Sequence, residues 1–186
     1  MENHDIPRRI VQLQNTPGEA HYLTFSCFQK RRFLIRDRTR QYVVGALDRA
    51  RAKHKFDLWA YVIMPTHIHV LLFPREDVYD MGKIETTIKL SVTRRAMNYL
   101  RRYNPEGLRY LATGQRDTPY RFWQQGEGYD ENLSTLEAAH AIAEYIHNNP
   151  VRAGLVANQE DWKWSSAREW LIEGSGPLSL DKNSFL

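Results

Sequence analysis

The sequence predicts an α+β fold in which helices cover an antiparallel sheet of four strands. Short runs rich in aromatic and β-branched residues are typical of strands. Longer stretches carry apolar residues at helical spacing and predict amphipathic helices. These patterns follow one another as strand, helix, strand, strand, helix, strand, which is the ferredoxin-like split βαβ order. A third helix pattern comes after them and would be free to cover the second face of the sheet.

Four segments have the composition of strands. The first reads AHYLTFSCFQ, and a tight turn at Pro65-Thr66 joins the second and third into an antiparallel hairpin. The fourth is short and aromatic, and Gly126, Glu127 and Gly128 beyond it predict a flexible break. The predicted strands are 20–29, 57–64, 67–73 and 120–124.

Three segments have the pattern of amphipathic helices. The first is 38–55, and the second is 81–103, where Ile84, Ile88, Leu90, Val92, Met97 and Leu100 form the expected buried side. The third begins at Ser134, because Ser134-Thr135-Leu136-Glu137 has the form of a capping box. Pro150 is expected to end it, so residue 149 should lie in its last turn or just beyond.

The chain of 186 residues is predicted to be one domain, 20–174, between an N-terminal arm, 1–19, and a loose C-terminal tail, 175–186. Trp162, Trp164 and Trp170 indicate that the end of the domain packs back on its body. One cysteine cannot form an internal disulfide, and no apolar run is long enough to span a membrane. The first residues do not have the pattern of a signal peptide, so we expect a cytoplasmic protein.

Positive charge is clustered although the net charge is only +4 and the pI about 9.2. Residues 30–40 hold six Lys or Arg residues against Asp37 alone, and a second cluster at 94–109 is opposed only by Glu106. Such clusters are typical of proteins that bind polyanions, although a solvated helix face is an equally good explanation of either one. The residues are Lys30, Arg31, Arg32, Arg36, Arg38 and Arg40, then Arg94, Arg95, Arg101, Arg102 and Arg109.

His67 and His69 are the most informative pair of residues. They lie in the β-favouring run YVIMPTHIHVLLF, so their imidazoles should share one face of a strand while Ile68 points to the other. Two neutral imidazoles side by side form half of a metal site. Taken alone, the pair is more often a half-exposed pair without a ligand.

Tyr145 and Asn149 supply what this half-site lacks. They lie four residues apart near the end of the third helix and therefore share one of its faces. If that helix crosses the histidine strand, Asn149 can add an amide oxygen as a third ligand, although Asn148 is its neighbour and could take that place. The mixed nitrogen and oxygen set suits Mg²⁺ or Mn²⁺ bound together with a phosphate.

Tyr145 is the candidate nucleophile. A phenol holds its proton at neutral pH, but a divalent ion beside it makes it more acidic and polarises a phosphodiester. Attack on phosphorus would leave a covalent phosphotyrosine link. Packing on an amphipathic helix is the ordinary role of such a tyrosine, and Tyr129 is a rival nucleophile that lacks an amide four residues later.

Two segments together resemble a known family. MPTHIH at 64–69 and YIHNNPVRAGLV at 145–156 resemble the single-tyrosine HUH transposases, and most closely the REP-associated tyrosine transposases of bacteria. HYLTF at 21–25, FWQ at 122–124 and WSS at 164–166 also resemble that branch, so the match spans residues 20–170. The position before the first histidine is often Asn in this branch and is Thr66 here.

The resemblance implies an HUH/RRM-like fold and a metal-dependent endonuclease and strand transferase that acts on single-stranded DNA. His67 and His69 match the ligands of a divalent cation, Mg²⁺ or Mn²⁺, and Asn149 matches the third ligand. Tyr145 matches the nucleophile that forms a 5′-phosphotyrosine and releases a 3′-OH. The DNA partner would carry palindromic, REP-type hairpins, and the enzyme would work as a monomer or homodimer near the bacterial nucleoid.

DNA contacts are expected from the basic stretches and from two residues of the aromatic segment. Arginine and lysine contacts with phosphates would give an affinity that falls steeply with salt. Reading bases needs amides or exposed planar groups, for which Arg121 and Gln124 are the candidates. The expected phosphate contacts are Lys30, Arg31, Arg32, Arg94, Arg95, Arg101 and Arg102.

Two other functions remain open from the residues alone. A non-catalytic nucleic-acid-binding module would have the same fold, but the chain lacks the aromatic signature of an RNA-recognition motif. A histidine-based phosphodiesterase without a covalent step would need a second His-x-Ser/Thr pair, which His21 and His54 do not supply.

Overall fold

The computed structural model describes residues 15–185. It contains the predicted α+β fold, with the four strands of the sheet in the order β2-β3-β1-β4 and every neighbouring pair antiparallel. In chain order the elements are β1 (Ala20–Cys27), α1 (Asp37–His54), β2 (Phe56–Ile63), β3 (His67–Pro74), α2 (Met81–Tyr103), β4 (Trp123–Leu133), α3 (Leu136–Arg152) and the short α4 (Ala167–Leu171). The short 3₁₀ turns are η1 (Phe28–Lys30), η2 (Pro105–Tyr110), η3 (Gln159–Asp161) and η4 (Lys182–Ser184).

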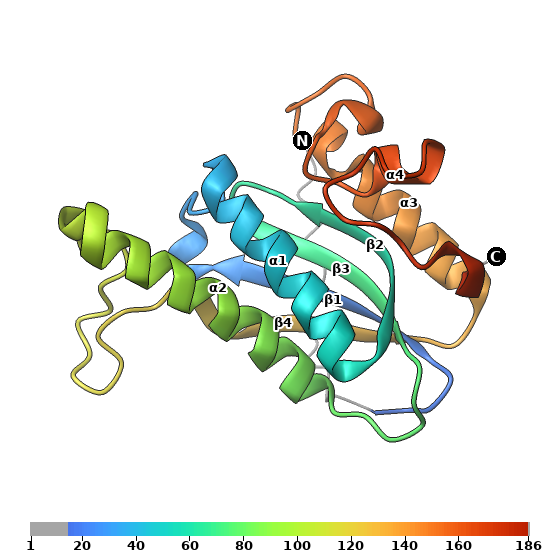
Figure 1. The fold of residues 1–186 in the computed structure, drawn as a ribbon, viewed down its shortest axis with the longest axis horizontal. Coiled ribbons are helices and arrows are strands. Elements are labelled where there is room, and N and C mark those ends of the chain that lie inside the picture. The colour runs from blue at the N-terminus through green and yellow to red at the C-terminus, as the bar shows by residue number, and fades with distance from the viewer. Residues whose placement is uncertain (1–14, 186) are drawn as a thin grey trace, which may run out of the picture.

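The sheet separates two layers of helices. Figure 1 shows α1 and α2 side by side over one face, with α3 and the C-terminal segments (orange to red) beyond β2. Leu23, Phe25 and Ile68 point toward α1 and α2 and belong to the larger core. Tyr22, Leu71 and Ile146 belong to a second core on the α3 side. Because side chains alternate along a strand, each strand between the layers supplies both cores.

The sequence predicted most elements to within two residues. The hairpin of β2 and β3 closes at Pro65-Thr66, where Met64 N–H donates to the carbonyl of His67 over 2.9 Å. The predicted second helix has the observed bounds of α2. Leu90 was wrongly expected on its buried side: it is 45 % exposed and lines a groove between α1 and α2.

The fourth strand was predicted in the wrong place. β4 begins at Trp123 rather than at residue 120 and runs to Leu133, through the glycines expected as a flexible break. Its residues pair with β1, and the register shifts between Phe25 and Cys27. Gly126 adopts a φ of 69°, which glycine accepts without strain. Pairing with β1 therefore keeps the glycine-containing segment in the sheet as an irregular strand.

Both predicted ends of the third helix need correction. The N-cap is Thr135 rather than Ser134, and its side chain accepts a hydrogen bond from Ala138 N–H. The helix passes through Pro150 and ends at Arg152. Proline removes one amide donor from the last turn, but the turn continues beyond it, since Ala153 N–H donates to the carbonyl of Asn149 over 3.0 Å.

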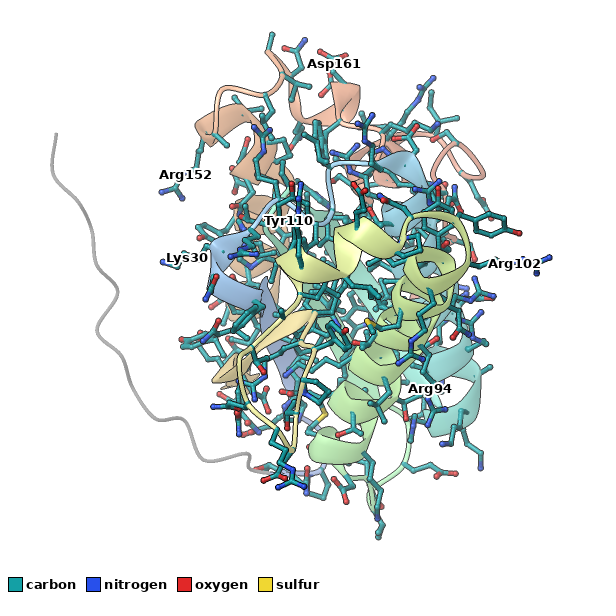
Figure 2. The ribbon with its side chains drawn as sticks, turned by 90° about the vertical axis from the view of Figure 1, so that its left-hand side faces the viewer. Lys30, Arg94, Arg102, Tyr110, Arg152 and Asp161 are labelled. Atoms are coloured by element: carbon teal, nitrogen blue, oxygen red, sulfur yellow. The ribbon has the colours of Figure 1, made fainter. Side chains whose placement is uncertain are left out.

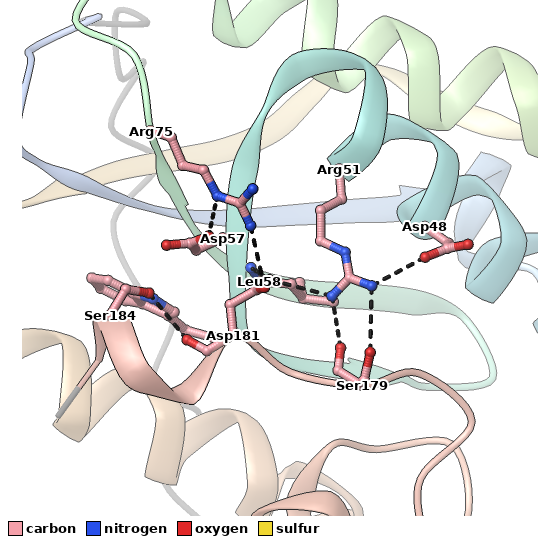
Figure 3. Close-up of polar contacts among 9 residues, drawn as sticks. Asp48, Arg51, Asp57, Leu58, Arg75, Ser179, Asp181 and Ser184 are labelled. Carbon is pink, nitrogen blue, oxygen red and sulfur yellow. Dashed lines mark hydrogen bonds and ion pairs between the residues drawn. The ribbon is translucent and has the colours of Figure 1, made fainter. Parts of the chain in front are cut away.

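The segment after Gly174 was expected to be loose, but it packs against the outer strand β2. Figure 3 shows Asp181 accepting hydrogen bonds from Leu58 N–H at 2.9 Å and from Arg51 at 3.2 Å. Phe185 is buried against Trp59, and the Trp59 indole donates to Ser184 over 2.9 Å. The domain boundary at residue 174 stays a prediction.

The three C-terminal tryptophans pack back on the body, as predicted. Trp164 is buried, Trp162 donates to the carbonyl of Ile63 and Trp170 donates to that of Trp59. The predicted arm 1–19 lies mostly outside the described residues. None of the helices in the described part of the chain is long and apolar enough to cross a membrane.

Candidate metal and nucleophile site

His67 and His69 share the α3-facing side of β3, as their spacing predicted. Ile68 between them is fully buried in the opposite core. The two imidazole centroids are 4.8 Å apart and their planes stand at 84°. The two rings are therefore direct neighbours on this face of the sheet.

His69 is held by the neighbouring strand β1. Its Nδ1 lies 2.7 Å from the Tyr22 hydroxyl and 2.9 Å from the Thr24 hydroxyl. Its Nε2 is buried and has no hydrogen-bond partner among the described residues. An Nδ1–H donated to either oxygen leaves a lone pair on Nε2, which is the usual tautomer of a metal-bound histidine.

His67 is oriented by its predecessor in the chain. Nδ1 of His67 lies 2.9 Å from the Thr66 hydroxyl. A proton on Nδ1 would again leave the Nε2 lone pair for a ligand. Thr66, which stands where the related branch often has Asn, thus retains a short polar side chain that can hold the ring.

Burial keeps both imidazoles neutral. It lowers the pKa of His67 to about 4 and that of His69 to about 3. The charge of Lys30 lowers the pKa of His67 further. His67 in turn lowers the pKa of His69, and a contact from Asn149 partly opposes that shift of His69. Neutral imidazoles are the form that binds a metal ion.

Helix α3 brings Tyr145 and Asn149 over the histidine strand. The Tyr145 ring lies 5.8 Å from that of His69 and 6.3 Å from that of Tyr22, edge-on to both. The Asn149 amide donates to the carbonyl of Tyr145 over 3.0 Å. Because that bond uses the amide nitrogen, the Asn149 side-chain oxygen remains as a possible ligand.

A buried tether fixes α3 to β2. Nε2 of His147 lies 2.8 Å from the Ser166 hydroxyl, and the same hydroxyl accepts from Tyr61 N–H over 2.8 Å. Ser166 is fully buried, and burial lowers the pKa of His147 to about 4. His147 lies on the same helix as Tyr145 and Asn149, so its contact with Ser166 positions both of them.

The donor set fits a divalent cation. Within residues 15–185 no cluster of three or more His, Cys, Asp or Glu could hold a metal, so a third protein ligand of another type would have to complete the site. Two imidazole nitrogens and the Asn149 oxygen form such a set, and the unpartnered Nε2 of His69 is the observation that favours it. A mixed set of this kind leaves positions for phosphate oxygens.

Some known proteins are similar to this chain in sequence or in fold. No protein-family model matches the chain. A curated protein of Haemophilus influenzae, named as a REP-associated tyrosine transposase, is 30% identical over 142 residues, which cover 72% of this chain and 75% of that protein. The chain belongs to the REP-associated tyrosine transposase family. These are enzymes of the HUH transposase type, so the chain is an enzyme.

The fold agrees with this assignment. A solved structure of a REP-associated tyrosine transposase bound to a REP hairpin superimposes with a TM-score of 0.68 and covers 88% of this chain and 86% of its own. Its sequence is only 18% identical, so the likeness concerns the fold alone.

In this REP-associated transposase, the basic residues expected to contact DNA fall into separate places. Lys30 is exposed near His67, whereas Arg31 and Arg32 line a cavity at the end of α2. Arg94 and Arg95 line the groove between α1 and α2, and Arg101 and Arg102 are exposed in the last turn of α2.

The two candidates for base reading lie at the start of β4 and beside η1. The side-chain oxygen of Gln124 accepts from Gln29 N–H over 3.0 Å, so it holds the backbone of η1. Arg121 is half-buried with its guanidinium 5.9 Å from the Phe28 ring. Tyr129, the rival nucleophile, lies on β4 and donates to Glu131 over 2.7 Å.

Four residues of the site were not singled out from the sequence. Tyr22 and Thr24 support His69, Ser166 tethers α3, and the Arg152 guanidinium lies 5.2 Å from the Tyr145 ring. The alternation of β1 would have placed Tyr22 and Thr24 on one face, but the pairing of Thr24 with His69 comes from the register of the sheet.

Proposed function

We propose that this transposase is a metal-dependent endonuclease and strand transferase that cuts single-stranded DNA beside REP-type hairpins through a 5′-phosphotyrosine intermediate. The observation that carries the proposal is the position of the Tyr145 ring 5.8 Å from that of His69, with Asn149 on the same face of α3. A nucleophile, two imidazoles and an amide converge from two elements that are far apart in the sequence. The hairpin is proposed because the related structure holds one.

The metal ligands proposed are His67, His69 and Asn149. A divalent cation bound there, Mg²⁺ or Mn²⁺, would supply a Lewis acid for the phosphodiester. The Tyr22 and Thr24 hydroxyls lie within hydrogen-bond distance of Nδ1 of His69, and either one can accept an Nδ1–H and so leave the Nε2 lone pair for the metal. Because their own pKa values are low, the histidines do not need to lose a proton near neutral pH before they bind.

Tyr145 is the proposed nucleophile. Its phenolic oxygen attacks phosphorus and loses its proton, the bond from phosphorus to the 3′ oxygen breaks, and that oxygen takes up a proton to become a 3′-OH. The 5′ phosphate stays on the tyrosine. Attack by another 3′-OH on the same phosphorus reverses these changes and joins a new strand, so no nucleotide cofactor is consumed.

Two cations would add positive charge to the proposed site. Arg152 stands 5.2 Å from the Tyr145 ring, and Lys30 lies near His67. Both place positive charge where an anionic phosphodiester approaches. The remaining basic residues would add contacts with the backbone of the DNA.

The test is a covalent-adduct assay. Single-stranded DNA that carries the repeat hairpins of the source genome is mixed with the protein in Mn²⁺ or in EDTA and separated on a denaturing gel. We expect an SDS-resistant protein–DNA band that needs Mn²⁺ and is absent from Tyr145→Phe. Tyr129→Phe is the matched control, because it removes a hydroxyl from a nearby strand and should keep the band.

Two results would contradict the proposal. An adduct that persists in Tyr145→Phe and disappears in Tyr129→Phe would move the nucleophile to β4. Tight binding without an adduct in any metal would leave a binding module on the same fold.

A further inference from the structure

A cavity of about 470 Å³ lies on the α1 and α2 side of the sheet, at the start of α1 and the end of α2. Its volume is within the range of small-molecule sites. Aromatic rings come from several separate segments: Phe33, Tyr42, Tyr99, Tyr110 and Phe122. Four arginines also line it: Arg31, Arg32, Arg36 and Arg38. We call it the Arg/Tyr pocket.

The lining of the Arg/Tyr pocket is unusually one-sided in charge. No acidic side chain lines it among the described residues, although the chain as a whole has 22 Asp and Glu against 26 Lys and Arg. Arginines next to aromatic rings suit a ligand that is both flat and anionic. A nucleotide of single-stranded DNA has these two properties, because its base has a π-face and its phosphate a negative charge.

Arg38 and Tyr99 form a stacking platform inside the pocket. The Arg38 guanidinium lies 3.4 Å from the centre of the Tyr99 ring, and Tyr103 packs against the same ring at 5.2 Å. Unpaired bases stack on aromatic rings and on guanidinium planes alike. The Asn104 amide also lines the pocket and can both donate to and accept from the edge of a base.

The pocket is joined to the catalytic face by a strained turn. Gln29 and Lys30 both adopt positive φ, 54° and 51°, which is costly for residues other than glycine. This turn leaves Lys30 near His67 and sends Arg31 into the pocket, where it donates to the carbonyl of Tyr110. Figure 2 looks at the end of the molecule that carries both Lys30 and Tyr110.

Backbone hydrogen bonds fix the same connection. Cys27 N–H donates to the carbonyl of Thr66 over 2.7 Å, and Leu34 N–H donates to that of Pro65 over 3.1 Å. The segment between Cys27 and Leu34 is therefore tied at both ends to the turn that leads into His67. Along the chain, this segment links Lys30 to the arginines of the pocket.

We propose that the Arg/Tyr pocket binds an unpaired base of the same DNA strand that Tyr145 cuts. The base stacks on the Arg38–Tyr99 platform and its phosphate lies on the arginines of the rim; this rests on the proposed function.

The groove between α1 and α2 has a different lining. It is larger, about 820 Å³, and is lined by cations such as Arg49, Lys53 and Arg94, but by no Phe, Tyr or Trp ring. Its chemistry suits phosphates alone.

The test compares the binding of single-stranded DNA that carries bases with that of DNA that lacks them. Binding of a fluorescein-labelled oligothymidine and of an abasic oligomer of the same length is measured by anisotropy, in EDTA, with the full chain. The wild type should bind the oligothymidine more tightly. Tyr99→Leu should lose this preference, with a loss of affinity for oligothymidine of about 5- to 100-fold, the usual size of base–aromatic stacking.

Variants separate stacking from charge and from folding. Tyr99→Phe keeps the ring and should keep the preference. Tyr110→Leu gives a second test at a half-exposed position outside the core. Lys53→Gln in the groove should weaken both oligomers equally, because it removes a phosphate contact only. Thermal melting of each variant checks that it is folded.

The outcomes distinguish this proposal from the proposed function. A wild type without preference for bases, or folded Tyr99→Leu and Tyr110→Leu proteins that keep it, would overturn the pocket assignment even if covalent adducts form in Mn²⁺. Loss of the preference in folded Tyr99→Leu, together with no adduct in the wild type, would keep the pocket as a base-binding site and reject the cleavage mechanism.

Discussion

The hydroxyl of Tyr22 lies 2.7 Å from Nδ1 of His69, across the pairing of β1 with β3. The two rings are also nearly parallel, with centroids 5.6 Å apart. A tyrosine on one strand thus holds the ring plane of a proposed metal ligand on the next, and its hydroxyl can accept an Nδ1–H from that ligand.

Tyr22→Phe should therefore weaken metal binding without removing a ligand. Partners of metal-bound histidines usually contribute about 10- to 100-fold in affinity, and Thr24 remains to hold the ring, so we expect the lower part of that range. Isothermal titration with Mn²⁺ measures the effect. Tyr129→Phe is the control, because its hydroxyl donates to Glu131 instead. Equal Mn²⁺ affinities for Tyr22→Phe and the wild type would show that Tyr22 does not orient the ligand.

Metal removal should lower the stability of the protein, and the size of the effect identifies the third ligand. A metal ion present at a hundred times its dissociation constant stabilises the folded protein by about 2.7 kcal/mol relative to the metal-free protein. Thermal melts in Mn²⁺ and in EDTA should differ for the wild type and for Asn148→Ala, but much less for Asn149→Ala. If the two melts differ for Asn149→Ala but much less for Asn148→Ala, the amide ligand is Asn148.

Ser166→Ala should loosen the helix that carries the nucleophile. Ser166 is fully buried, and its removal leaves Nε2 of His147 and the amide of Tyr61 without this partner. Each unsatisfied buried group costs about 1–3 kcal/mol. Chemical denaturation should show that loss, together with a slower formation of the covalent adduct. Ser175→Ala removes a half-exposed hydroxyl within hydrogen-bond distance of the carbonyls of Ile172 and Arg168, and should change neither.

The order of elements and the core of the site were accessible from the sequence because they depend on local periodicity. Alternation along β3 places His67 and His69 on one face, and the spacing of Tyr145 and Asn149 places them on one side of a helix. These relationships need no knowledge of distant contacts. For the same reason the bounds of α2 were predicted correctly, since a long amphipathic pattern determines them.

What the sequence did not predict depends on contacts between distant segments. β4 is a strand because it pairs with β1, more than ninety residues earlier, despite its glycines. The Arg/Tyr pocket joins Arg31, Tyr99 and Tyr110, which no local pattern connects. The C-terminal segment is polar and short, and its packing follows from Asp181 and Phe185 finding partners on β2.

Asp181→Ala should weaken the packing of that segment on β2. Its carboxylate accepts from the buried amide of Leu58 and also pairs with Arg51 and Arg75 (Figure 3). Leaving the Leu58 amide unsatisfied should cost about 1–3 kcal/mol in the free energy of unfolding, measured in denaturant. Asp48→Ala removes an exposed carboxylate that also pairs with Arg51, and should cost about 0–1 kcal/mol. Equal costs for the two variants would mean that the buried hydrogen bond contributes nothing beyond an exposed ion pair.

Cys27 should be unreactive in the folded protein. It is fully buried, and burial raises the pKa of its thiol to about 12, although backbone contacts from Phe33 and Leu34 partly oppose the shift. The thiolate is the reactive form, so at about pH 8 little of it exists and the reagent cannot reach it. A disulfide reagent such as DTNB should label the protein in denaturant but not without it.

The same shift predicts a loss of stability in alkaline solution. Because the folded pKa of Cys27 lies above the unfolded value, the unfolded chain loses this proton first as pH rises. The contribution of the protonated Cys27 thiol to the free energy of unfolding is complete below the ordinary thiol pKa. It declines as the pH rises from that value to about 12. Cys27→Ala should lose less stability than the wild type over this interval, when unfolding is measured in denaturant at each pH. Parallel curves for the two proteins, or rapid labelling of the native thiol, would show that Cys27 is accessible and not shifted.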